Sequence, residues 1–207
     1  MSKLFDYENP VWNFVGKLVD LLILTGLWFV CSIPVITFGA STKALYTVAL
    51  RLTKDEESYT ISSFFREFKK DFANSTVCGL AALALGVFLA ADLYVYWNMS
   101  SKLGAFLFAF FFVMALLYLM TFVYLFPMMA VTEYKGVRLV MVSFVTSLKN
   151  PGWSVLMILV MVVMVVFGLF VAAPFLVIGI GLAAYIQCKI TVLVTKHYHI
   201  KTQQEEN

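Results

Sequence analysis

The sequence predicts an all-α fold: a polytopic transmembrane helix bundle of about five spans, with amphipathic helices along the inner membrane surface. Two observations lead to this fold class. First, Trp153 to Cys188 form a run of 36 residues without Lys, Arg, Asp, Glu or His, whereas one helix needs about 20 apolar residues to cross a bilayer. Second, 62% of the 207 residues are hydrophobic and 13% are charged, against roughly 25% charged in soluble domains. We expect a single membrane domain over residues 1–207.

Proline and polar residues divide this domain into its elements. Asn9-Pro10 is typical of a helix start, because Asn can cap a helix and Pro suits its first turn. Pro34 and Pro127 are expected to end spans, and Pro174 to separate the last two. The predicted spans are 11–33, 77–97, 103–126, 153–172 and 174–194, and the predicted surface helices are 42–52, 61–75 and 134–149.

The distribution of basic residues predicts the orientation. Lys and Arg concentrate in cytoplasmic connections, and the net charge is +3. With the N-terminus outside, the inner connections carry 11 of the 15 basic residues: Lys43, Arg51, Lys54, Arg66, Lys69, Lys70, Lys135, Arg138, Lys149, Lys196 and Lys201. We therefore expect a multi-pass protein of the cell membrane with its C-terminus in the cytoplasm. A re-entrant hairpin at 153–194 would instead place the tail outside.

Three ionisable residues fall within predicted spans, where such side chains are costly and often functional. They are Asp92, Lys189 and Asp20. All three lie near a predicted span end, so partial hydration is the alternative explanation, and Lys189 could extend toward the interface. None lies at a bilayer midpoint, which argues against a proton-relay pump.

No motif predicts catalysis, a cofactor or a metal site. The three cysteines lie in apolar segments without CxxC spacing. The sequence contains no Walker loop, HExxH or GxSxG motif and no pair of carboxylates in one span. The basic residues are few and scattered, so nucleic acid is not an expected partner. We expect a non-enzyme whose partners are the lipid bilayer and a membrane transporter or sensor; a homo-oligomer is also possible.

One stretch has a more specific pattern than the rest. Leu27 to Tyr46, LWFVCSIPVITFGASTKALY, resembles the signature of the YesL-like family of small bacterial integral membrane proteins of unassigned function. The resemblance implies a four-to-six-helix bundle in the cytoplasmic membrane and a role around carbohydrate uptake. Physically, Pro34, Thr37, Gly39 and Ser41 form a helix-break motif. Such a break could bind an ion through exposed backbone, or it could be a corner between two helices.

A weak internal similarity offers an alternative function. Residues 63–69, SFFREFK, resemble residues 143–149, SFVTSLK, and each segment precedes an apolar hairpin. Duplicated helical units occur in some transporters, although two surface helices could share composition without duplication. We therefore expect a non-catalytic accessory linked to carbohydrate uptake or its regulation. The alternative is a small-solute or ion transporter built from a pseudo-repeated helical hairpin.

Overall fold

The computed structural model describes residues 10–54, 59–99, 101–171 and 173–205, and within these ranges all the regular structure is helical. The all-α fold is thereby confirmed. The elements are α1 (Pro10–Ser32), the 3₁₀ turn η2 (Val35–Thr37), α2 (Phe38–Thr53), α3 (Thr60–Lys69), α4 (Phe72–Trp97), α5 (Lys102–Val131), α6 (Gly136–Lys149), α7 (Pro151–Val171) and α8 (Ala173–Glu205).

Three of these helices are long and apolar enough to cross a membrane: Val15–Ser32 of α1, α4 and α5. The helices α6 and α7 meet at a bend of 104° and could form a fourth, broken span. A shorter apolar segment, Gly179–Thr195, lies in α8. The described residues thus contain three or up to four candidate spans. The number of five spans therefore stays a prediction.

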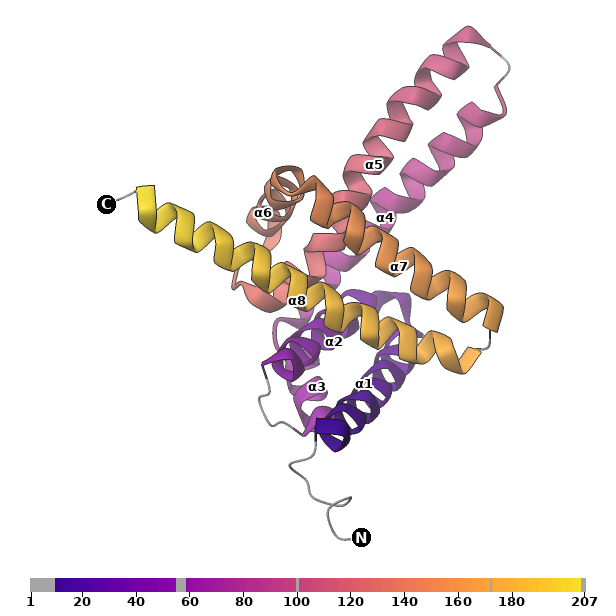
Figure 1. The fold of residues 1–207 in the computed structure, drawn as a ribbon. Coiled ribbons are helices and arrows are strands. Elements are labelled where there is room, and N and C mark those ends of the chain that lie inside the picture. Colours follow the sequence, from indigo (N-terminus) through magenta and orange to yellow (C-terminus); the bar gives the residue numbers. More distant parts are fainter. Residues whose placement is uncertain (1–9, 55–58, 100, 172, 206–207) are drawn as a thin grey trace, which may run out of the picture.

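The helix α2 lies between α8 and the pair α1 and α3 in the lower part of the view (Figure 1). It packs against α1, α3, α4, α5 and α8, and Ala44, Val48 and Ala49 are completely buried. We expected residues 42–52 to form a surface helix. In the structure most of this helix is enclosed by protein, because its small residues allow neighbouring helices to approach from several sides.

Two helix boundaries differ from the prediction. The helix α5 continues through Pro127 to Val131 instead of ending before the proline; Pro127 and its neighbours are buried against other helices. The predicted helix 61–75 is divided at Lys70–Asp71, where Asp71 adopts the left-handed conformation with φ 56°. Asp tolerates this conformation better than most residues, and the break turns the chain from α3 into α4.

The hairpin of α4 and α5 projects away from the other helices (Figure 1). Its inner end packs on α2 and the turn η2. The amphipathic helix α6 buries Leu139 and Ser143, while its apolar stripe faces outward. The exposed stripe consists of Val137, Val140, Met141, Phe144, Val145 and Leu148. Exposed apolar faces of this kind fit contact with lipid rather than with water.

Candidate functional site

A polar pocket of about 540 Å³ lies where α2, the α3–α4 junction and the end of α5 meet. Its walls include residues as far apart in the sequence as Lys43 and Lys135. We call it the polar pocket. It is lined by Lys43, Thr47, Leu50, Arg51, Lys54, Glu67, Lys70, Asp71, Asn74, Ser75, Met129, Ala130, Val131, Thr132, Glu133, Tyr134 and Lys135.

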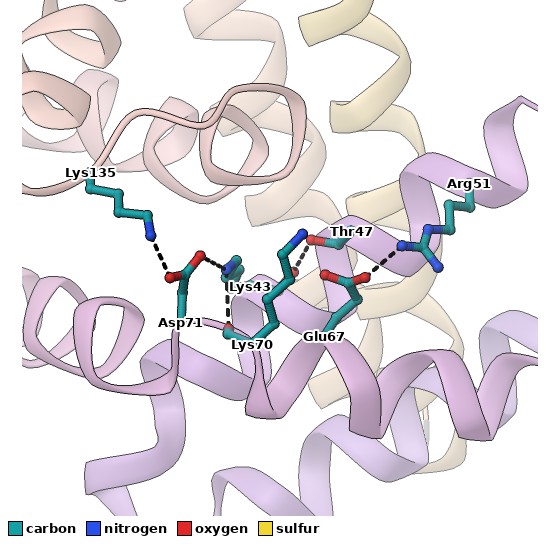
Figure 2. Close-up of polar contacts among 7 residues, drawn as sticks. All are labelled: Lys43, Thr47, Arg51, Glu67, Lys70, Asp71 and Lys135. Carbon is teal, nitrogen blue, oxygen red and sulfur yellow. Dashed lines mark hydrogen bonds and ion pairs between the residues drawn. The ribbon is translucent and has the colours of Figure 1, made fainter.

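Asp71 joins the three segments of the polar pocket (Figure 2). Its Oδ1 accepts a hydrogen bond from Lys135 Nζ at 2.5 Å, and its Oδ2 lies 3.5 Å from Lys43 Nζ. Lys43 Nζ also donates to the backbone carbonyl of Lys70 at 3.2 Å. The hydrogen bond from Lys135, together with the positive charges of Lys43 and Lys135, holds the pKa of Asp71 below its ordinary value, and partial desolvation opposes this shift.

A second ion pair fixes α3 against α2. Arg51 donates to Glu67 Oε1 at 2.5 Å, as Figure 2 shows, and Arg66 Nε lies 3.9 Å from the same oxygen. The Glu67 side chain is only 5% exposed, although it lies within the predicted surface helix 61–75. A nearly buried carboxylate needs a close cation, and Arg51 supplies it from the neighbouring helix.

The remaining charged groups give the polar pocket a positive balance. Its lining contains five basic and three acidic side chains, a formal charge of +2. Lys54 and Lys70 make no ion pair with the described residues, which exclude 55–58. Both lysines are exposed at the rim. All five basic residues belong to connections that the sequence predicts to be cytoplasmic.

The three predicted intramembrane residues lie apart from this pocket. Asp20 accepts a hydrogen bond from Thr60 Oγ1 at 2.7 Å, which links α1 to α3. Asp92 lies toward the tip of the α4–α5 hairpin, and its Oδ2 is buried without a hydrogen-bond partner among the described residues. Lys189 is exposed and lies 5.5 Å from the ring centre of Tyr185, close enough for a weak cation–π contact.

The helix-break motif forms the corner between α1 and α2. The Thr37 hydroxyl lies 2.5 Å from the carbonyl of Cys31 and 2.8 Å from that of Pro34. Ser41 Oγ lies 2.7 Å from Ser32 Oγ, and Gly39 touches the backbone of α4. The hydroxyls of Thr37 and Ser41 thus already have partners within the corner, which supports the corner alternative over an ion site.

Sequence reasoning grouped the basic residues on one side but did not bring them to one pocket. The missing information is the break at Asp71, which has no Gly or Pro to signal it. It turns the chain so that Asp71, Asn74 and Ser75 face the end of α5. Among the described residues, no group of three His, Cys, Asp or Glu side chains is placed to hold a metal ion.

Comparisons with known proteins agree with the resemblance seen in residues 27–46. A family model described as "Protein of unknown function, DUF624" matches residues 21–93. The uncharacterized protein YesL of Bacillus subtilis (strain 168) is 26% identical over 161 residues, which cover 76% of each chain. None of the solved structures matches the chain.

Proposed function

We propose, because this chain is a helical membrane protein similar to the YesL-like family of unknown function, that it is a non-catalytic accessory of carbohydrate uptake or of its regulation. One observation supports the accessory role. The polar pocket is a charged surface whose basic residues all belong to predicted cytoplasmic connections. A cytoplasmic or membrane-bound partner can therefore reach it from one side. The link to carbohydrate is supported by the family resemblance.

The arrangement of charge supports binding more than conduction. Charged residues that carry ions across a membrane line a path through it. The charged side chains of the polar pocket instead gather where α2, α3 and the end of α5 meet, and Asp92 lies outside the pocket, on the projecting hairpin. The pairs Asp71–Lys135 and Arg51–Glu67 hold these segments together.

The accessory role is tested by isolating the tagged protein in mild detergent from cells growing on a carbohydrate that they must import. We expect a subunit of a transporter or of a membrane sensor to co-purify. A partner that docks on the positive pocket is expected to present an acidic surface. Lys54→Glu, at the rim of the polar pocket, would place a negative charge against that surface and should reduce recovery of the partner severalfold. Lys102→Glu, in the opposite connection, is the matched control. Isolation of the chain alone would contradict the accessory role.

One observation favours the transporter as a second candidate: the Oδ2 of Asp92 is buried and has no hydrogen-bond partner within the described part of the chain. A carboxylate without a partner inside a membrane hairpin could bind a coupling ion. Vesicles containing the purified protein should then show flux of a small solute or ion, and Asp92→Asn should abolish it. If flux is present but unchanged by Asp92→Asn, Asp92 has no part in transport.

A further inference from the structure

We propose that the polar pocket binds a phosphate group, carried by a small soluble molecule or by a lipid headgroup. This inference deepens the proposed function and rests on it in one respect, since both treat the polar pocket as the functional site. Three properties of the pocket support phosphate binding: a net positive charge after ion pairing, hydrogen-bond donors without partners among the described residues, and a suitable volume.

The acidic side chains of the pocket do not cancel its positive charge. Asp71 is shared by Lys43 and Lys135, and Glu67 is shared by Arg51 and Arg66. The group around Asp71 therefore keeps one positive charge. Arg66 does not line the pocket, so within the lining Arg51 and Glu67 balance each other. Lys54 and Lys70 at the rim add two more, against one negative charge from Glu133. Of the three carboxylates that an anion would meet, Asp71 and Glu67 already have cationic partners, and Glu133 is exposed.

Donors remain available on several walls of the pocket. Lys70 Nζ has no partner among the described residues, and Arg51 uses one of its nitrogens for Glu67. Ser75, only 1% exposed, lines the same pocket, and its hydroxyl has no hydrogen-bond partner in the part of the chain that the structure describes. Buried hydroxyls normally have partners, so Ser75 is the observation that points most directly to a ligand.

The size of the polar pocket indicates what carries the phosphate. Small-molecule sites commonly measure about 300–1,000 Å³, and the polar pocket, at about 540 Å³, is larger than a lone phosphate ion requires. Leu50, Met129 and Val131 form an apolar part of the wall. The phosphate would meet the lysines and Arg51, which bind phosphate oxygens through charge-assisted hydrogen bonds, and the rest of the molecule would contact the apolar part.

The first experiment uses soluble phosphate. The full-length protein in a neutral detergent is titrated with inorganic phosphate or pyrophosphate, with chloride at equal ionic strength as the reference, and thermal unfolding is followed. We expect a saturable rise in unfolding temperature. Lys70→Ala should weaken the apparent affinity about tenfold, the effect of one charge-assisted hydrogen bond. Lys70→Arg should retain most of the affinity.

Lys69→Ala is the matched control, because Lys69 is an exposed neighbour that does not line the pocket. The apparent phosphate affinity of Lys69→Ala should stay within about twofold of that of the parent protein. The second arm uses nanodiscs of phosphatidylcholine with or without phosphatidic acid. Stabilisation that needs phosphatidic acid and depends on Lys70 identifies a lipid headgroup as the source. Lack of Lys70-dependent stabilisation in both arms would overturn the proposal.

These readouts are separate from partner isolation. If phosphate binds but no transporter or sensor subunit co-purifies, the accessory role fails and the phosphate site remains. If a subunit co-purifies but neither phosphate source stabilises the protein through Lys70, the phosphate site fails and the accessory role remains.

Discussion

Gly39 of α2 and Gly79 of α4 bring the backbones of their helices into direct contact. A Cβ added to Gly39 would lie 3.0 Å from Gly79 Cα and even closer to the carbonyl of Ser75. Close backbone approach through small residues is a common way for membrane helices to pack. This contact holds α4 against α2 and so positions Ser75 at the wall of the polar pocket.

The first prediction follows from this contact. Gly39→Ala should destabilise the protein by about 1–3 kcal/mol, because the obstructing atoms belong to the backbone and α4 would have to move. Gly26→Ala is the control: no atom lies within 4 Å of a Cβ at Gly26, so alanine should be neutral or slightly stabilising. Thermal unfolding in the same detergent measures both. Equal effects of the two substitutions would show that the α2–α4 contact is not tight.

The second prediction concerns pH. The folded-state pKa of Asp71 lies below its ordinary value of about 3.8, so its ionised form stabilises the folded protein. This contribution is complete above pH 3.8 and is lost as the pH falls through the lowered pKa. Asp71→Asn retains a residue that tolerates the left-handed conformation and removes the charge.

The measurement for Asp71 is the unfolding temperature between pH 7 and pH 3. The parent should exceed Asp71→Asn at neutral pH, by an amount in keeping with about 1 kcal/mol for a partly exposed pair. The difference should shrink as the pH approaches 3. A constant difference over this range would mean that the charge of Asp71 is not its source.

The third prediction concerns the cation beside Glu67. Arg51→Met should destabilise the protein by about 1–3 kcal/mol, because a carboxylate that is 5% exposed would lose its main partner. Arg66→Ala should have an effect below about 0.5 kcal/mol, since Arg66 is 63% exposed and more distant. The double variant Arg51→Met/Glu67→Gln should recover much of the loss, and chemical or thermal unfolding can measure the coupling. If the separate effects of Arg51→Met and Glu67→Gln simply add in the double variant, the two side chains do not form a direct pair.

The fourth prediction concerns topology. In a variant whose native cysteines are replaced, a cysteine introduced at Lys102 should react with a membrane-impermeant thiol reagent in intact cells. A cysteine at Lys54 or at Thr202 should react only after permeabilisation. This result would support the predicted orientation, with the α4–α5 connection outside and the C-terminus inside. Labelling at Thr202 in intact cells would instead place the tail outside, which requires residues 153–194 to cross the membrane an odd number of times.

The helical fold and most helix positions could be predicted from composition and from the positions of proline and polar residues. The run from Trp153 to Cys188, the start at Asn9-Pro10 and the end before Pro34 correspond to observed helices or breaks. Pro127 was misleading, because a proline deep in a packed helix is tolerated when neighbouring groups compensate for the lost hydrogen bond. The span count depends on helix directions, such as the 104° bend between α6 and α7, which length and hydropathy do not specify.

The polar pocket could be predicted only in part. Charge asymmetry grouped Lys43, Lys70 and Lys135 on one side of the membrane. Their convergence depends on Asp71, whose left-handed backbone has no distinctive sequence signal. The burial of Glu67 depends on a contact with another helix, and the pattern of a single helix cannot reveal it.

The projection of the α4–α5 hairpin has a consequence for handling the protein. Beyond its inner end the hairpin has lateral contact mainly between its own two helices (Figure 1), and residues such as Val87, Phe88 and Phe106 are exposed there. Lipid acyl chains must therefore make the lateral contacts that neighbouring helices would make in a closed bundle. A short-chain surfactant that covers this arm poorly should cause aggregation before the helices around α2 lose their packing.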